Sequence, residues 1–231
     1  MPDPRPHGFF ITATDTEVGK TWCTLALMQA FQSAGHRVAG MKPVASGCQA
    51  INGQLQNDDA LLLQQQSSRN YDYSVVNPFA FLPPIAPHIA AAIDGKIIDL
   101  DLVQQYFTRL AGENDTVLVE GIGGWRVPLS NGQTLADLVR ALKLPVILVV
   151  GLRLGCISHA LLTVEAICAD DISLAGWVAN HCQADYASEE ATLTTLSQAI
   201  PAPLLGVLPW LPGLEVKQLA AHLNLKLLPP R

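Results

Sequence analysis

The stretch that decides the fold is Phe9-Phe10-Ile11-Thr12-Ala13-Thr14-Asp15-Thr16-Glu17-Val18-Gly19-Lys20-Thr21, which precedes the helix-favouring run Leu25-Ala26-Leu27-Met28-Gln29-Ala30. Phosphate-binding loops occur in this order: an apolar strand, a polar loop and a helix that begins near Gly-Lys-Thr. Backbone N–H groups at such a helix start attract an anion, and the helix dipole adds to the attraction. We therefore expect Lys20 to reach the β- and γ-phosphates of a nucleotide and the Thr21 hydroxyl to bind Mg²⁺.

The loop departs from the usual pattern at its first position. That pattern has a glycine, any four residues and then Gly-Lys, and Thr14 stands where the first glycine would be. An alternative is a helix start that carries Gly-Lys-Thr by chance. The strand and helix signals on either side agree with each other and favour the phosphate-binding interpretation.

Length and composition indicate a compact globular protein. The chain has 231 residues, of which 49% are hydrophobic and 15% are charged. We expect one domain over residues 1–231, with a short proline-rich tail at residues 1–7, because no repeat, linker or low-complexity tract interrupts the pattern.

Charge and cysteine usage narrow the class of protein. The net charge is −6 without a basic run, so we expect no binding to nucleic acid or to a membrane surface. No signal peptide is evident, and no apolar stretch approaches the ~20 residues that span a bilayer. The five cysteines form no Cys-x-x-Cys pair, which argues against a zinc site or disulfide framework and favours a reducing, cytoplasmic location.

Apolar, β-branched runs alternate with helical segments along the chain. The alternation predicts an α/β fold of the P-loop NTPase kind, with a mainly parallel sheet flanked by helices on both faces and the run Val146–Val150 at its centre. The predicted strands are Phe9–Thr12, Val38–Met41, Thr116–Val119, Pro145–Val150, Leu174–Ala179 and Leu204–Val207. The predicted helices are Gly19–Ala34, Asp58–Gln66, Leu100–Leu110, Thr134–Leu142, Ser158–Ala169, Ala187–Ala199 and Leu214–Leu223, with a long proline-containing connection before Leu100.

Residues that can do chemistry recur where the predicted strands stop. Lys42, Glu120 and Asn180 each follow a strand, as the phosphate loop does. Ligands of open α/β sheets bind outside the carboxyl ends of the strands, so these groups should gather at one edge. Lys42 is either a solvated strand end or a second phosphate-binding cation. The following Pro43 and Gly47 stiffen the turn and permit close approach, which favours the second interpretation.

Acidic residues at two places in the chain are candidate Mg²⁺ ligands. Asp58 and Asp59 open a helix, where the dipole alone also favours carboxylates. Glu120 ends a buried strand, where a carboxylate is costly unless a cation or donor meets it. Thr21, Asp59 and Glu120 together would supply oxygen ligands suited to octahedral Mg²⁺.

In nine stretches spread over nearly the whole chain, the sequence resembles the dethiobiotin synthetase family, the ATP-dependent ligases of biotin biosynthesis. Many ATPases share the phosphate loop, but the ordered set of matches over nearly the whole chain is specific. The matching stretches are Thr14–Thr21, Lys42–Gly47, Asn57–Leu61, Pro87–Ala90, Val119–Trp125, Leu144–Gly151, Leu154–Ala160, Gly176–Asn180 and Ile200–Gly206.

The resemblance implies a cyclo-ligase reaction. One amine of 7,8-diaminononanoate captures CO2 as a carbamate, whose oxygen attacks the γ-phosphate of ATP to give a carbamic–phosphoric anhydride. The second amine then closes a cyclic urea, so the products are dethiobiotin, ADP and phosphate. Two anions must meet in this reaction, and the fixed positive charge of Lys20, Lys42 and Mg²⁺ suits that need.

The resemblance also implies residue roles. Lys42, Lys20 and Thr16 would be catalytic, Thr21, Asp59 and Glu120 would hold Mg²⁺, and Asn180 would read adenine beside a wall at Pro209, Trp210 and Leu211. The expected nucleotide contacts are Glu17, Val18, Gly19, Lys20, Thr21, Trp22, Asp59, Glu120, Gly121, Ile122, Gly123, Asn180, His181, Pro209, Trp210, Leu211 and Glu215. The expected substrate contacts are Ser46 and, from the partner subunit of a homodimer, the helix start at Cys156, Ile157 and Ser158.

Three rival functions remain open at this point. A non-enzymatic ATP switch of the partitioning type shares the fold and loop, but carries lysine where this chain has Asp15. A related amidotransferase would need a glutaminase domain for which 231 residues leave no room. A nucleotide-binding paralogue without turnover is disfavoured by the intact Lys20, Lys42 and Glu120.

Overall fold

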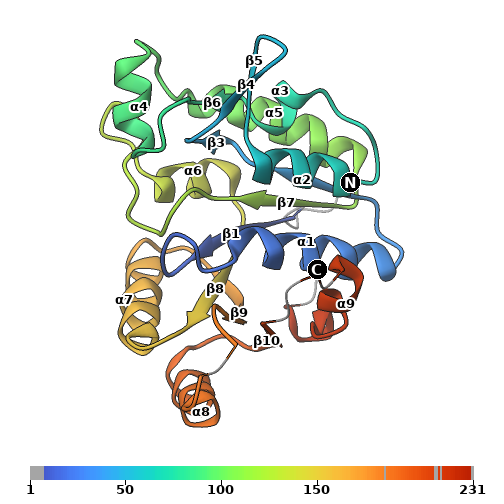
Figure 1. The fold of residues 1–231 in the computed structure, drawn as a ribbon, viewed down its shortest axis with the longest axis vertical. Coiled ribbons are helices and arrows are strands. Elements are labelled where there is room, and N and C mark those ends of the chain that lie inside the picture. Colours follow the sequence, from blue (N-terminus) through green and yellow to red (C-terminus); the bar gives the residue numbers. More distant parts are fainter. Residues whose placement is uncertain (1–7, 185, 211–212, 214, 230–231) are drawn as a thin grey trace.

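The computed structural model describes residues 8–184, 186–210, 213 and 215–229. Its centre is a six-stranded sheet in the order β10-β9-β8-β1-β7-β2, in which every neighbouring pair is parallel (Figure 1). The strands are β1 (Gly8–Ala13), β2 (Val38–Met41), β7 (Thr116–Glu120), β8 (Val146–Leu152), β9 (Leu174–His181) and β10 (Leu204–Leu208). The predicted fold class is confirmed, and the apolar β8 lies between β1 and β9 as expected.

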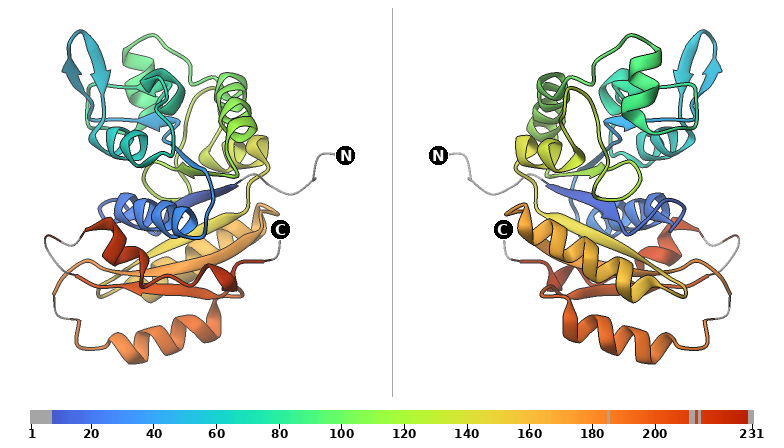
Figure 2. Two further views of the ribbon diagram at one scale, coloured as in Figure 1. Left: turned by 90° about the vertical axis from the view of Figure 1, so that its right-hand side faces the viewer. Right: turned by 90° about the vertical axis from the view of Figure 1, so that its left-hand side faces the viewer.

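Helices cover both faces of the sheet (Figure 2). Because side chains alternate along a strand, Ile147 and Val149 of β8 pack with α1 and α9 on one face, whereas Leu148 and Val150 pack with α7 and α8 on the other. The main helices are α1 (Lys20–Ser33), α2 (Asp58–Gln66), α5 (Leu100–Glu113), α6 (Leu135–Leu142), α7 (Cys156–Ala169), α8 (Glu189–Ala199) and α9 (Val216–Ala220), followed by a 3₁₀ turn at Leu225–Leu227.

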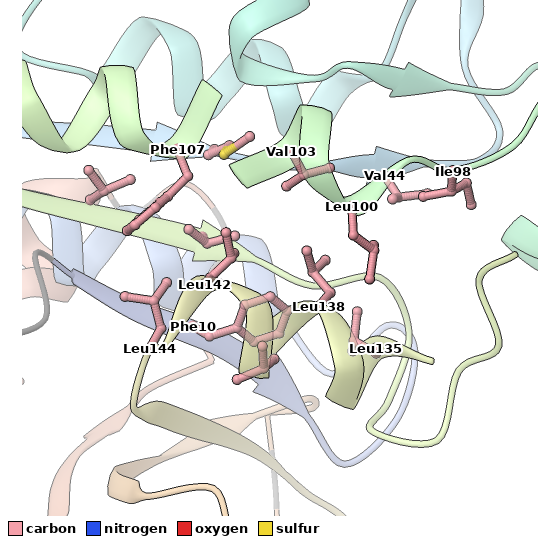
Figure 3. Close-up of a cluster of buried hydrophobic side chains, with 14 of the residues drawn as sticks. Phe10, Val44, Ile98, Leu100, Val103, Phe107, Leu135, Leu138, Leu142 and Leu144 are labelled. Carbon is pink, nitrogen blue, oxygen red and sulfur yellow. The ribbon is translucent and has the colours of Figure 1, made fainter. Parts of the chain in front are cut away.

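The largest core cluster fills the space between the sheet and helices α5 and α6. Phe10 points from β1 towards Leu135 and Leu138 of α6, with Val103 and Phe107 of α5 nearby (Figure 3). All five side chains are buried. This packing holds β1 and β7 in place, and both strands lead directly into the candidate site.

Six short elements that were not predicted lie between Met41 and Leu100, three of them before α2 and three within the predicted long connection after it. These are β5 (Gln54–Gln56), paired with β4 (Gln49–Ile51), β6 (Phe79–Ala80), paired with β3 (Val44–Ala45), and the helices α3 (Tyr73–Val76) and α4 (Pro87–Ile93). The β4–β5 turn has positive φ at Asn52 and Gly53, a pair that favours two-residue hairpin turns. The sequence carried that signal, whereas the other pieces are too short to show a period.

Most element ends agree with the prediction within two residues. The helix expected at Ser158 begins at Cys156, and the one expected at Ala187 begins at Glu189. The predicted tail at residues 1–7 and Leu214, the first residue of the last predicted helix, lie outside the described residues. Within the described part of the chain, every helix is too short or too polar to cross a bilayer.

Candidate active site

The loop between β1 and α1 has the backbone shape of an anion cradle. Glu17 and Gly19 have φ of 59° and 80°, so left-handed residues alternate with ordinary ones and turn successive N–H groups towards one side. Thr14 N–H bonds to the Val149 carbonyl at 3.0 Å, which fixes the start of the loop on the sheet. A Cβ at Gly19 would lie 2.2 Å from Asn180 Nδ2, so this glycine is required both by φ and by space.

Lys42 lies at the centre of a charge cluster that is buried at Glu120 and reaches solvent at Asp59. Its Nζ is 2.7 Å from Asp59 Oδ2 and 2.6 Å from Glu120 Oε1, and the Glu120 side chain has no exposed surface. The structure thus brings together Lys42, which follows β2, Glu120 at the end of β7 and Asp59 of α2. Sequence reasoning placed the first two at one edge of the sheet. Two carboxylates around one ammonium leave the cluster ready for further positive charge.

The backbone of Lys42 is held as firmly as its side chain. Its N–H bonds to the Val76 carbonyl at 2.9 Å, and the Asn77 carboxamide donates to its carbonyl at 2.6 Å. Asn77 also accepts from the Tyr73 hydroxyl at 2.8 Å, and that hydroxyl accepts from Asn57 N–H at 2.7 Å. Sequence reasoning missed this network. The only sign of this network in the sequence is an asparagine followed by a proline, Asn77-Pro78.

The donor set beside Lys42 fits a hard divalent cation. Thr21 Oγ1 is 3.0 Å from Glu120 Oε1, while Glu120 Oε2 is buried without a hydrogen-bond partner. An unpaired buried carboxylate oxygen is costly, and a cation would satisfy it. Asp59, joined to the same lysine, adds a further carboxylate. Two carboxylates and a hydroxyl form the partial shell to which Mg²⁺ adds water and phosphate oxygens.

The two site lysines differ in their electrostatic surroundings. Burial lowers the pKa of Lys20, and the attraction of Glu120 offsets only part of that effect. Burial also opposes the charged form of Lys42, but Glu120 and Asp59 outweigh it and raise the pKa of Lys42. Lys20 Nζ donates to the Gly123 carbonyl at 2.9 Å. An arriving phosphate would therefore restore the stability of the Lys20 ammonium.

Two cavities meet at the phosphate loop. One has a volume of about 310 Å³ and contains the charge cluster, and the other has a volume of about 490 Å³ and lies towards β9 and α9. They share Glu17, Gly19 and Trp22. The first is lined also by Thr16, Lys20, Thr21, Lys42, Ser46, Asn57, Asp59, Glu120, Ile122 and Gly123. The second is lined also by Asn180, His181, Cys182, Pro209, Trp210, Gly213 and Leu219.

The larger cavity has the character of a site for a flat ring. Trp22 and Trp210 line it and remain 48% and 46% exposed, and aromatic faces of this kind stack on bases. Asn180 Nδ2 donates to the Val18 carbonyl at 2.9 Å, so the carboxamide predicted to read adenine also braces the phosphate loop. Cys182, which sequence reasoning did not select, lines the same cavity.

Some predicted nucleotide contacts have other neighbours in this structure. Gly121 leaves room for Phe10, since a Cβ there would lie 2.9 Å from the ring. The His181 ring is 3.2 Å from Glu189, and Glu215 forms a capping box at the start of α9. Leu211 lies outside the described residues. The nucleotide role stays a prediction for these residues, as it does for the predicted contacts that line the two cavities.

The start of α7 carries the predicted substrate-carboxylate contacts. Gly155 precedes the helix with φ of 91°, and the Cys156 side chain is buried. Ser158 is exposed, and Leu154, just before the helix, is 96% exposed. Cys156, Ile157 and Ser158 line neither of the two cavities at the phosphate loop of the same chain.

Comparison with known proteins gives a consistent family. A model described as an AAA domain matches residues 7–218. An ATP-dependent dethiobiotin synthetase from Aromatoleum aromaticum is 48% identical, and the match covers 96% of this chain and 98% of that protein. One from Escherichia coli K12 is 50% identical over 88% of this chain and 90% of that protein. This chain belongs to the dethiobiotin synthetase family.

Solved structures support the fold of this dethiobiotin synthetase family member. Chloroplast FtsY from Physcomitrella patens has a TM-score of 0.58 at 17% identity, covering 93% of this chain and 61% of that one. The MinD cell division protein from Aquifex aeolicus has a TM-score of 0.57 at 14% identity, covering 94% of both chains. At such identities the likeness concerns the fold alone, which is that of P-loop NTPases.

Proposed function

We propose that this chain is an ATP-dependent dethiobiotin synthetase, a cyclo-ligase that joins 7,8-diaminononanoate and CO2 at the expense of ATP and that acts within one domain. The observation that carries the proposal is the charge cluster in which Lys42 lies between Asp59 and Glu120, in the cavity that residues of the phosphate loop also line. The family membership supports it. The partitioning-type switch is not favoured, because its likeness to this chain is limited to the fold.

In the proposed complex the adenine lies between Trp22 and Trp210, and the triphosphate follows the loop towards Lys20. Thr21, Asp59 and Glu120 would hold Mg²⁺, which screens the phosphate charge when bound. Lys20 leaves the Gly123 carbonyl for the β- and γ-phosphates, because a phosphate oxygen is the stronger acceptor.

The reacting end of the proposed site must press two anions together. The carbamate oxygen forms a bond to the γ-phosphorus as the bond to ADP breaks, and the second amine then attacks the carbamate carbon and expels phosphate. The Lys42 ammonium is positioned to stabilise the charge on the phosphoryl oxygens in the first step. The Ser46 hydroxyl lines this cavity, and its oxygen is buried without a partner, so it can bond to the substrate.

The proposed reaction is tested by measuring ADP release with 7,8-diaminononanoate and bicarbonate omitted in turn. We expect stoichiometric ADP and dethiobiotin only in the complete mixture. ADP release that does not depend on the diamine would instead support a switch ATPase, and ATP binding without any turnover would support the inactive paralogue.

The Glu120→Gln variant tests the proposed metal site. We expect the Mg²⁺ concentration at half-maximal turnover to rise roughly tenfold, because an amide oxygen is a weaker ligand than a carboxylate. Glu113→Gln, at the exposed end of α5, is the control and should leave the titration unchanged. A Glu120→Gln enzyme with the wild-type magnesium titration would remove Glu120 from the ligand set.

We also infer a homodimer and a reducing, cytoplasmic location, the latter supported by five free cysteines. Exposed apolar side chains occur on two helices that both lie at the left of Figure 1, namely Ile89 and Ile93 on α4 and Leu162 on α7, besides Leu154 before α7. Burial of these side chains against a partner subunit would be favourable. A partner subunit would then bring its α7 start to the substrate carboxylate.

Leu154→Asp tests that arrangement, since burying a carboxylate in an interface is costly. Sedimentation equilibrium should find a dimer for the wild type and mainly monomer for the variant, with ATP affinity retained and the KM for the diamine raised roughly tenfold or more. A monomeric wild type with full activity would contradict the dimer.

A further inference from the structure

The phosphate loop contains a carboxylate besides that of Glu17, namely Asp15, and each of the two Asp15 oxygens has a partner. Its Oδ1 accepts the Thr16 N–H at 2.8 Å, and its Oδ2 pairs with Nη2 of Arg153. Arg153 follows β8 directly, and its own carbonyl accepts the Cys156 N–H at 3.0 Å in the turn that begins α7. The β8–α7 connection thus sends one guanidinium back onto the loop.

The pair is too exposed to contribute much to stability. The side chains of Arg153 and Asp15 are 37% and 46% exposed, and ion pairs as exposed as this contribute little to folding because water screens them. Its location suggests a different role. Thr16, which shares the Asp15 carboxylate through its N–H, lines the cavity that contains Lys20.

The loop has an unfavourable charge for its ligand without Arg153. Between Thr14 and Thr21 the carboxylates of Asp15 and Glu17 outnumber the one ammonium of Lys20. A carboxylate next to a triphosphate repels it, and the repulsion is strong where solvent is partly excluded. Arg153 supplies the missing positive charge from a neighbouring strand end.

We propose that Arg153 is a positioning residue that neutralises Asp15 and thereby sets the affinity of the phosphate loop for ATP. The inference rests on the proposed function in one respect, the binding of ATP at this loop. In this arrangement Asp15 orders the Thr16 N–H, and Arg153 removes the electrostatic penalty of having Asp15 there.

Equilibrium binding of MgATP to four proteins tests the proposal. Arg153→Gln should raise the Kd for ATP about tenfold, because an uncompensated carboxylate remains in the loop. Asp15→Asn should bind ATP at least as tightly as the wild type. The double variant should return to within about twofold of the wild type, since both charges are gone. The Kd ratio of Arg153→Gln to wild type should shrink when salt rises from about 50 to about 500 mM.

Two further variants separate this role from a structural one. Arg153→Lys keeps the charge and should recover most of the affinity. Arg37→Gln breaks a comparably exposed pair with Asp115, beside the amino ends of β2 and β7, and should leave the Kd for ATP unchanged. All variants should melt within a few degrees of the wild type.

The outcomes distinguish the proposal from its premise. A double variant that binds ATP as weakly as Arg153→Gln would show that Arg153 contacts the nucleotide itself, and an Arg153→Gln protein with wild-type affinity would remove any role. Either result would overturn the proposal, but neither would contradict the binding of ATP at this loop, which is its premise. A wild type that binds no ATP would refute the proposed function instead.

Discussion

Replacing Lys42 by alanine is expected to lower the rate of dethiobiotin formation at least ~100-fold while ATP binding is largely kept. Lys42 lies beside the metal-ligand candidates rather than within the phosphate loop, and its ammonium is fixed by Asp59 and Glu120 before any substrate arrives. Such preorganised charge acts mainly on the transition state. The measurement is kcat for the complete reaction together with the Kd for MgATP.

A control is needed because Lys42→Ala leaves the buried Glu120 carboxylate without its cationic partner, which destabilises the fold. Lys42→Arg preserves the charge and tests the role if the alanine variant melts early. Lys96→Ala removes an exposed lysine of another surface and should have no effect. An Lys42→Ala enzyme that turns over at the wild-type rate would remove Lys42 from the mechanism.

Gly19→Ala is expected to weaken ATP binding by about 100-fold. Alanine is strained at a φ of 80°, and its Cβ would lie 2.2 Å from Asn180 Nδ2. Relief of that clash would push Asn180 away from the Val18 carbonyl, so the phosphate loop would lose its anchor to β9 as well. The measurement is the Kd for MgATP, followed through the fluorescence of Trp22 and Trp210.

Gly53→Ala is a matched control for that variant. Gly53 has a φ of 81° in the β4–β5 turn, and a Cβ there would have no atom within 4 Å. The two substitutions therefore impose similar backbone strain, but only one disturbs the loop. The role assigned to Gly19 would be contradicted if Gly19→Ala bound ATP as tightly as the wild type. It would also be contradicted if Gly19→Ala and Gly53→Ala lost the same amount of ATP affinity.

The sequence predicted the large elements well because each contains enough residues to show its period. The apolar run at β8 and the amphipathic pattern of α5 are examples, and the ends of both were close. The two-residue strands β3 and β6 could not be predicted, since their pairing depends on tertiary contacts rather than on local pattern. The four-residue helix α3 could not be predicted for the same reason.

The candidate site was partly predictable for a topological reason. Lys42, Glu120 and the phosphate loop all follow parallel strands, so their common edge follows from the fold class alone. The contacts between particular side chains do not follow from the fold class. The ion pair of Asp15 with Arg153 joins residues 138 positions apart, and it forms because β8 happens to neighbour β1. The support of the Lys42 carbonyl by Asn77 likewise depends on how α3 packs.

The central claim is that one cavity brings a carbamate oxygen into contact with the γ-phosphate held by the loop. The most direct test uses bicarbonate labelled with ¹⁸O, with turnover faster than exchange of the label with water. Mass analysis of the released phosphate should find one ¹⁸O atom, because the attacking oxygen leaves with phosphorus while the other stays in the urea of dethiobiotin. Released phosphate without label would contradict the claim, since ATP would then have been cleaved by water and not by the carbamate.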